Sequence, residues 1–457
     1  MALTDTRNSP PPRVFARLRM RVRQWRAGEH ALTQRMAGIA FLIRMASAAI
    51  IFLSQVLLAR WMGDSEFGIY VYAWTWLMLV GELVHLGMPL TAQRFIPEYT
   101  HARAFDMLRG YLAGSRWITF GAGTVAALLG AVIVHEIEDR LDSRVIMPFY
   151  LVCAALPFYA STFMFDAMAR SYNWINLALL PPYIVRPLLL IAGVAFARAL
   201  GFVMDAVTVT AVLAMAIWLS ALFQLAMLQR RLATVVPPGD KNYGARLWFN
   251  TALPIVLVWG MYTLLTATDV IVLKIFRSAG EVAHYYAAAK TLALVSIIQY
   301  AVSAASAHRF TAYRIAGDSA GLASFAAGTV RWVFWPSLAG CTLMLLLGKP
   351  ILALFGSGFG GGYPVIVILA VGQLARACVG PVERLLNVLG QQHTCALAYA
   401  AAFAFNLLGC FFLAPRFGGI GVAYATAGAF IVESALLFLI ARRQLGLHMF
   451  VWRRQSA

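Results

Sequence analysis

The sequence predicts an all-α polytopic membrane protein, with about twelve transmembrane helices in two six-helix lobes around a central cavity. Of its 457 residues, 61% are hydrophobic and only 12% are charged, whereas soluble domains are about 45–50% apolar and about 25% charged. Long apolar runs that contain Gly and Pro favour helices over an outer-membrane barrel, whose strands alternate apolar and polar residues. This composition excludes a soluble enzyme, a disordered chain and a nucleic-acid-binding module.

A membrane-crossing helix needs about 20 predominantly apolar residues, and twelve segments of the sequence have that length. The first six spans are predicted at 36–58, 69–91, 111–134, 145–167, 175–196 and 202–228. The second six are predicted at 248–273, 282–307, 330–347, 363–386, 394–413 and 420–440.

The longest polar break between spans, 229–247, divides the chain into two lobes predicted at 36–228 and 248–441. The chain begins with a basic segment, 1–35, and ends with a basic tail, 442–457. Within the first segment, residues 13–26 alternate arginine with apolar side chains, and we expect a cationic amphipathic helix that lies on the anionic inner leaflet. An unstructured positive tail is the alternative.

Basic residues predict the orientation, because cytoplasmic loops collect Lys and Arg. With the N-terminus inside, the cytoplasmic segments together with the adjoining ends of the spans hold 25 of the 37 basic residues, the outer loops hold 8, and 4 lie deeper within spans. Both termini are therefore predicted to be cytoplasmic. The net charge of +18 then reflects topology, and no nucleic-acid partner is expected.

No catalytic or metal-binding motif is recognisable in the sequence. The five cysteines lie in apolar stretches without metal-ligand spacing (Cys153, Cys341, Cys378, Cys395 and Cys410). Nucleophile elbows, zinc-protease pairs and phosphate-binding Walker loops are also lacking. We therefore predict a protein that is not an enzyme, with no catalytic residues, no metal site and no bound cofactor.

The two halves are related by an internal repeat. At an offset of 215, residues 56–99 align without a gap to residues 271–314, with ten identities in 44 positions. The identities include Glu66 with Glu281 and Tyr70 with Tyr285. Each half has an even number of spans, so the repeats share one orientation and enclose a cavity, which is a transporter architecture.

Four blocks of sequence resemble the oligosaccharide flippase family of polysaccharide biosynthesis. Residues 58–70 (LARWMGDSEFGIY) resemble its first signature, and residues 268–290 resemble the repeat of that signature. The blocks at 351–390 and 417–426 resemble patterns of its second half. The family, which includes O-antigen flippases, belongs to the multidrug/oligosaccharidyl-lipid/polysaccharide exporter superfamily.

The resemblance implies a V-shaped carrier that alternates between inward-open and outward-open forms. Its cargo would be an oligosaccharide linked to undecaprenyl pyrophosphate, moved from the cytoplasmic to the periplasmic leaflet of the bacterial inner membrane. The implied partners are this lipid-linked cargo, membrane lipids, and glycan polymerase and assembly proteins. The pathway would be O-antigen, exopolysaccharide or capsule synthesis.

A pyrophosphate cargo requires cations within the membrane, since an unpaired buried charge is costly. Four basic residues lie deeper inside predicted spans, away from the cytoplasmic ends, and are candidate cargo contacts: Arg44, Lys290, Arg186 and Arg376. They outnumber the three nearest acids, Glu82, Glu433 and Asp269, which favours an anionic cargo. Structural ion pairs that lock helices together are the alternative role for these cations.

Three residues are candidates for ion coupling. Glu82 and His85 are three residues apart and share a helix face in the second span. A carboxylate at this depth could take up and release a proton, and the resemblance leaves an H+ or Na+ gradient open as the energy source. Glu433 is a further coupling candidate. The alternative for Glu82 is a structural pair with Arg44.

Three other functions compete with a flippase. An ion-coupled multidrug antiporter of the same superfamily should have an acidic rather than a basic cavity. A membrane enzyme that joins glycans needs a large outer loop with catalytic groups, which the sequence does not contain. A scaffold for a glycan-assembly complex would tolerate neutralisation of its buried charges.

Overall fold

The computed structural model describes the backbone of residues 13–451. Side chains are described for residues 38–451, except at positions 254, 255, 257, 258, 304, 305, 307, 308 and 392. The predicted amphipathic stretch 13–26 is part of a long helix, but its side chains lie outside the described part of the chain, as do residues 1–12 and 452–457.

Helices and short turns make up the described chain, as the hydropathy pattern predicts. The first half contains α1 (Arg13–Met62), α2 (Asp64–Val84), α3 (Met88–His101), α4 (Phe105–Glu136), η1 (Glu138–Arg140), α5 (Ser143–Ser171), α6 (Ile175–Leu180), η2 (Pro181–Val185), α7 (Arg186–Ala199) and α8 (Ala206–Val235). The second half contains α9 (Ala245–Phe276), α10 (Ala279–Ala316), α11 (Ser319–Ala353), η3 (Phe359–Gly362), α12 (Tyr363–Val379), α13 (Val382–Val388) and α14 (Gln392–Leu445).

Eleven helical segments of the described chain are long and apolar enough to cross a membrane. The last of them, α14, folds back on itself at Gly418, where the backbone is not helical. The hydroxyl of Thr426 lies 3.4 Å from Asn406 Oδ1, although 20 residues of straight helix would separate them by about 30 Å. Counting both arms of α14 confirms the prediction of about twelve crossings.

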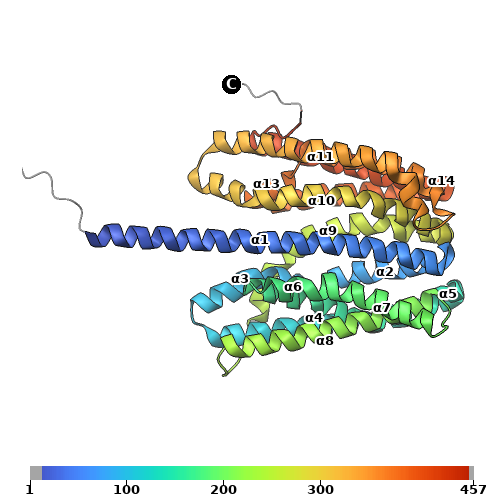
Figure 1. Cartoon of the computed structure of the whole chain (residues 1–457), viewed down its shortest axis with the longest axis horizontal. Coiled ribbons are helices and arrows are strands. Elements are labelled where there is room, and N and C mark those ends of the chain that lie inside the picture. The colour runs from blue at the N-terminus through green and yellow to red at the C-terminus, as the bar shows by residue number, and fades with distance from the viewer. Residues whose placement is uncertain (1–12, 452–457) are drawn as a thin grey trace, which may run out of the picture.

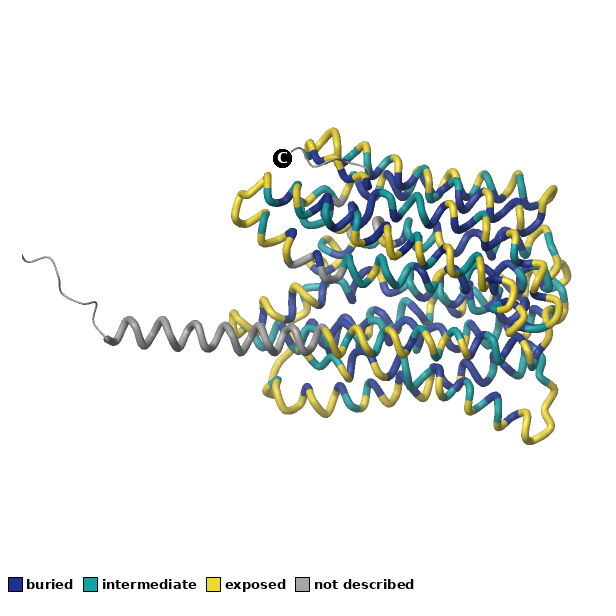
Figure 2. Tube along the Cα trace, turned by 45° about the horizontal axis from the view of Figure 1, so that its top comes forward, coloured by how far each residue is buried: buried dark blue, intermediate teal, exposed yellow. Residues whose placement is uncertain are grey.

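The helices form two lobes with α1 lying between them (Figure 1). We call α2–α8 the N-lobe and α9–α14 the C-lobe. Near the N-terminal end of α1, each lobe has its own apolar core: one contains Phe95 and Met168, and the other contains Phe310 and Leu385. We call this end, where the helix ends are exposed, the open end (Figure 2). The opposite end is the closed end.

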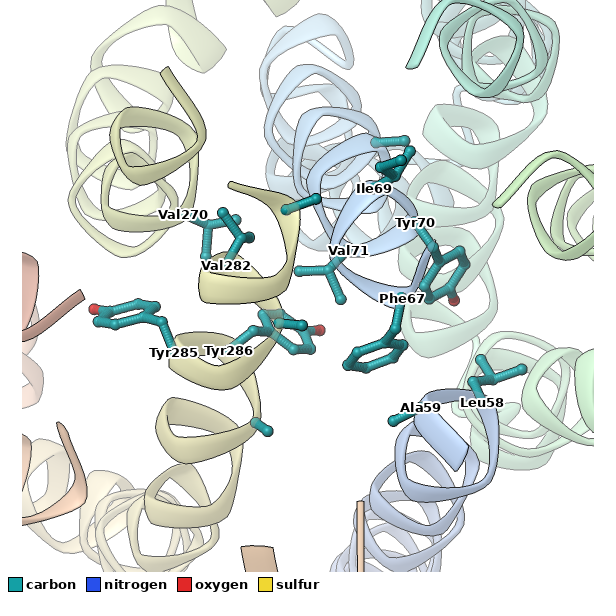
Figure 3. Close-up of a cluster of buried hydrophobic side chains, with 14 of the residues drawn as sticks. Leu58, Ala59, Phe67, Ile69, Tyr70, Val71, Val270, Val282, Tyr285 and Tyr286 are labelled. Atoms are coloured by element: carbon teal, nitrogen blue, oxygen red, sulfur yellow. The ribbon is translucent and has the colours of Figure 1, made fainter. Parts of the chain in front are cut away.

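At the closed end, one apolar core joins both lobes (Figure 3). The Phe67 ring on α2 lies 6.3 Å from the ring of Tyr286 on α10 and 6.3 Å from that of Phe359 in η3. Asp64 lies 3.7 Å from His284 across the same interface. Aromatic rings packed between the lobes exclude water, so the closed end is sealed.

The connection between the lobes differs from the prediction in its length. Helices α8 and α9 continue into the polar break, so only residues 236–244 connect them. Arg109 holds this connection by donating hydrogen bonds to the carbonyls of Pro237 and Asp240 at 3.0 and 2.7 Å. Trp248, at the start of α9, is fully buried in the N-lobe core. The first turns of α9 therefore pack on the N-lobe although the predicted C-terminal lobe begins at 248.

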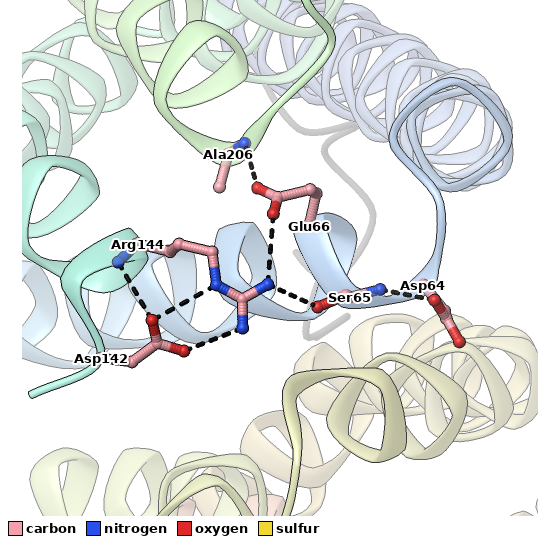
Figure 4. Close-up of polar contacts among 6 residues, drawn as sticks. All are labelled: Asp64, Ser65, Glu66, Asp142, Arg144 and Ala206. Carbon is pink, nitrogen blue, oxygen red and sulfur yellow. Dashed lines mark hydrogen bonds and ion pairs between the residues drawn. The ribbon is translucent and has the colours of Figure 1, made fainter.

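The two aligned glutamates have equivalent roles in the two halves. Glu66 Oε2 accepts a hydrogen bond from the backbone nitrogen of Ala206, the first residue of α8, at 2.9 Å (Figure 4). Glu281 Oε1 accepts one from the nitrogen of Gly419, at the start of the second arm of α14, at 2.7 Å. Each carboxylate thus caps the positive end of the last crossing in its own half.

Three crossings are interrupted within their length. The second crossing breaks between α2 and α3, where Leu86 and Gly87 have φ of 51° and 70°. The fifth contains the π-helical turn η2, and the tenth breaks at Gly380, with φ of 64°. Irregular backbone inside a membrane is tolerated where protein or a cavity surrounds it. The breaks therefore indicate where polar groups are brought together.

Candidate functional site

A cavity of about 390 Å³ lies between the lobes. Helices α1, α2, α5 and α7 line it from one side, and α10 of the C-lobe lines it from the other. Five of its lining residues are aromatic side chains that carry a hydroxyl or an indole N–H: Tyr70, Trp74, Tyr159, Tyr183 and Tyr286. The predicted central cavity is therefore present between the two lobes.

Two of the four predicted cations line this cavity. The guanidinium of Arg186, directly after the π-helical turn, lies 5.2 Å from the ring centre of Tyr159 and 5.8 Å from that of Trp74. Lys290 Nζ lies 4.9 Å from the ring centre of Tyr286. Aromatic faces stabilise a cation without neutralising it, and neither residue forms an ion pair within the described part of the chain.

Arg44 lies beside the cavity rather than in its lining. Its guanidinium stacks 3.9 Å from the ring centre of Tyr183, a lining residue, and 5.8 Å from that of Tyr300. Within the described part of the chain, Arg44, Arg186 and Lys290 form no ion pair. Three unpaired cations on aromatic faces therefore surround the space between the lobes.

Arg376 and Glu433, predicted separately as a cargo contact and a coupling group, are partners in the structure. Arg376 Nη2 on α12 lies 3.3 Å from Glu433 Oε1 on α14, and the two side chains are 14% and 4% exposed. They line a second cavity of about 280 Å³ within the C-lobe. The alternative of a structural pair therefore applies to Arg376, which is the one predicted cation whose charge is neutralised.

Glu82 lines the central cavity at the break between α2 and α3. Its Oε2 accepts a hydrogen bond from Trp259 Nε1 on α9 at 2.9 Å and lies 3.6 Å from His85 Nε2. The expected pairing of Glu82 with Arg44 is wrong, since Arg44 contacts tyrosines instead. The shared face of Glu82 and His85 is present as predicted.

The state of the His85 ring follows from its hydrogen bonds. His85 Nδ1 accepts a hydrogen bond from the backbone nitrogen of Gly87 at 3.1 Å. The ring proton is therefore on Nε2, the nitrogen that faces Glu82. In this arrangement His85 directs an N–H toward the carboxylate.

Asp166, which was not among the predicted site residues, also lines the cavity. Arg170, one helical turn later, donates two hydrogen bonds to its two carboxylate oxygens at 2.7 and 2.8 Å. The spacing of four residues is typical of such a helical pair, and Asp166 lies at the end of the span predicted at 145–167. Because Arg170 neutralises Asp166, Glu82 is the lining carboxylate without an arginine or lysine partner among the described residues.

Asp269, one of the three acids named with the buried cations, is held by hydrogen bonds inside the C-lobe. It accepts hydrogen bonds from the Tyr285 hydroxyl and from the backbone nitrogen of Val270, both at 2.8 Å. It lies in the C-lobe core and is 8% exposed. Asp269 is therefore not among the residues that line the central cavity.

No family model and no curated protein matches the chain. Solved structures do match it. An inward-facing multidrug resistance MATE family transporter of the MOP superfamily aligns with a TM-score of 0.74 at 13% identity, covering 89% of this chain and 98% of its own. The lipid II flippase MurJ, in an inward closed conformation, aligns with a TM-score of 0.68 at 14% identity, covering 88% and 87%.

A third similar structure is a MOP superfamily transporter from Pyrococcus furiosus, described as having a binding pocket of reversed polarity. It aligns with a TM-score of 0.67 at 13% identity, covering 90% of this chain and 95% of its own. The chain therefore has the MOP-superfamily transporter fold, and it is a multi-pass membrane protein. At these identities, the similarity extends to the fold and leaves the substrate open.

Proposed function

We propose that this protein is a flippase that moves a polyprenyl-pyrophosphate-linked oligosaccharide from the cytoplasmic to the periplasmic leaflet by alternating access. One observation carries the proposal: Arg186 and Lys290 line the aromatic cavity between the lobes, Arg44 lies beside it, and none of the three forms an ion pair with a described residue. A lipid II flippase is among the proteins of similar fold. The transported group would serve surface polysaccharide synthesis.

The cavity chemistry supports an anionic head group with sugars. A planar guanidinium such as that of Arg186 binds phosphate oxygens in pairs, whereas the ammonium of Lys290 acts as a point charge. Tyrosine and tryptophan offer flat apolar faces with a polar edge. Such surfaces suit sugar rings, which carry C–H groups on their faces and hydroxyls at their rims.

The proposed cycle begins with the conformation described above. The cavity would receive its cargo at the open end while the aromatic core around Phe67 keeps the other end sealed. Rocking of the lobes would then part Phe67 from Tyr286 and Asp64 from His284. The basic residues near the termini support a cytoplasmic open end, so this state would be inward-open.

Glu82 is the proposed coupling group. Its hydrogen bond to Trp259 joins the two lobes, and a charged acceptor strengthens that bond. Protonation of Glu82 would weaken the link and ease the movement of the lobes. A proton gradient, or a Na+ gradient acting at the same carboxylate, would then bias the cycle.

Depletion of the protein in its host tests the function. Lipid-linked oligosaccharide should accumulate on the cytoplasmic face, and Lys290→Ala and Arg44→Ala should reproduce the accumulation. Arg442→Ala, which removes an exposed charge at the end of α14, is the matched control. Accumulation on depletion but not in the two variants would contradict the residue roles. Unchanged lipid intermediates on depletion would contradict the flippase.

A multidrug antiporter is the second candidate, because Glu82 supplies a carboxylate in the cavity and a protein of similar fold is a multidrug resistance transporter. An antiporter should export cationic dyes from loaded vesicles and lose that export in Glu82→Gln. A flippase should leave the dyes in place. If the protein is a flippase, we propose that its partners include glycan polymerase and assembly proteins.

A further inference from the structure

A groove with one charged residue lies on the outer surface of the N-lobe, away from the cavity between the lobes. It is a groove of about 300 Å³ whose floor is α5 and whose walls are α4 and α8. The floor consists of Phe158, Ser161 and Phe165, three or four residues apart and therefore on one helix face. The walls carry Arg116, Trp117, Phe120, Ala221, Leu222, Leu225 and Gln229.

The groove faces the surrounding lipid. Trp117 is 73% exposed and Leu222 is 50% exposed, although both belong to membrane-crossing helices. At its inner end the rings of Phe120 and Phe158 meet edge to face, 5.5 Å apart. Apolar side chains therefore line a slot that opens to the acyl chains of a bilayer.

Arg116 is the charged residue of this groove. Its Nε donates a hydrogen bond to the carbonyl of Leu112 in its own helix at 2.7 Å. Within the described residues it has no acidic partner. The other guanidinium donors are thus free for a ligand, and a lone cation among lipid-facing apolar groups favours an anion beside it.

The depth of Arg116 suits the phosphate of a phospholipid. It lies 11 residues after Phe105, the start of α4, or about 16 Å along the helix axis. The 32 residues of α4 span about 48 Å, well beyond a hydrocarbon layer of about 30 Å. A centred helix places the Arg116 backbone about 7 Å inside the hydrocarbon boundary, a depth from which the long arginine side chain can reach the head groups.

We propose that this groove binds one anionic phospholipid of the surrounding membrane, with its phosphate against Arg116 and one acyl chain along Phe158 and Phe165. The charge selects an anionic head group over a zwitterionic one. The apolar floor, which continues from Arg116 toward the bilayer centre, accommodates the chain. The site is independent of the proposed transport cavity.

The test uses the purified full-length protein with phosphatidylglycerol or phosphatidylcholine, and measures bound lipid by native mass spectrometry. Wild type should retain phosphatidylglycerol in preference. Arg116→Gln should weaken that binding about tenfold, the loss expected for a hydrogen bond to a charged group. The matched control is Arg442→Gln, which removes the same charge from the exposed end of α14 and should bind as wild type does.

A second pair of variants tests the groove without changing charge. Leu222→Trp should fill the slot and reduce phosphatidylglycerol binding to the level of Arg116→Gln. Phe223→Trp, one residue further on α8 and 52% exposed, points to a different side and should not. Equal binding by Arg116→Gln and Arg442→Gln would overturn the proposal.

Competition with polyprenyl phosphate tests whether the phosphate bound at Arg116 belongs to a phospholipid or to a polyprenyl carrier lipid. If it displaces phosphatidylglycerol at a lower concentration, and only when Arg116 is present, the groove belongs to a carrier lipid and the phospholipid proposal is wrong. If phosphatidylglycerol persists, the groove is a phospholipid site. Either result leaves the transport assay unaffected, so this test is separate from that of the proposed function.

Discussion

Trp259 of the C-lobe donates a hydrogen bond from its indole Nε1 to Glu82 Oε2 of the N-lobe, and the two atoms are 2.9 Å apart. Glu82 lies in the last turn of α2, directly before the helix break at His85–Gly87. Its carboxylate is therefore located where the backbone of the second crossing is irregular. This contact joins the lobes away from the sealed aromatic core.

Removal of the indole donor should loosen the lobes. Trp259→Phe loses a hydrogen bond to a charged acceptor, which is worth about 1.5–3 kcal/mol, so the ratio of open to closed conformers should change about tenfold or more. Distance measurements between spin labels on the open ends of α3 and α10 report this ratio. Trp332→Phe, on a lipid-facing residue that is 73% exposed, is the control and should change nothing.

Neutralisation of Glu82 should separate transport from the proton gradient. Glu82→Gln keeps the shape of the side chain and a weaker hydrogen bond from Trp259, but it cannot exchange a proton. Transport in vesicles should therefore respond less to an imposed pH gradient, while His85→Gln should retain the response. An unchanged gradient dependence in Glu82→Gln would rule out this residue as the coupling group.

Arg376 should matter for stability more than for cargo binding. Arg376→Ala leaves Glu433 buried at 4% side-chain exposure without its partner, and such a loss costs about 3–5 kcal/mol. Thermal unfolding in detergent should show a large decrease in Tm. The double variant Arg376→Met with Glu433→Leu should recover most of it, because both buried charges are then gone. A stable Arg376→Ala protein with impaired cargo binding would instead support the original role of a cargo contact.

Gly68 should be required for closure of the lobes. A Cβ atom at this position would collide with the backbone carbonyl of Ala279 on α10, and a backbone atom cannot move aside as a flexible side chain can. Gly68→Ala should therefore hold α2 and α10 apart at the closed end and favour the conformer in which that end is open. Cysteine cross-linking across that end should become slower than in wild type. Gly121→Ala is the control, since nothing lies within 4 Å of its added Cβ.

Hydropathy and charge predicted the parts of this fold that depend on each segment alone. Apolar length identifies a span wherever it folds, because the bilayer requires every backbone group to be bonded within the helix. The offset of 215 residues identified Glu66 and Glu281 as equivalent, and the structure gives both the same capping role. The fold at Gly418 also lies between two predicted spans.

The hydropathy pattern does not predict which helices pair with one another. Hydropathy does not encode which face of a span meets which neighbour, so Arg376 and Glu433 were assigned separate roles although their side chains meet. Asp166 and Arg116 both lie near the cytoplasmic ends of predicted spans, where charged residues are common, so hydropathy does not single them out. Glu82 was expected beside Arg44, but α9 brings Trp259 to it instead.

The sequence by itself determined that this is a two-fold repeated, multi-pass helical membrane protein with a few charges inside its spans, because these properties follow from local composition and length. Only the tertiary structure decided which of those charges are neutralised. Arg376 finds Glu433 on another helix, whereas Arg186 and Lys290 find tyrosine faces. A charge remains available only when its neighbours in space, rather than in sequence, leave it unpaired.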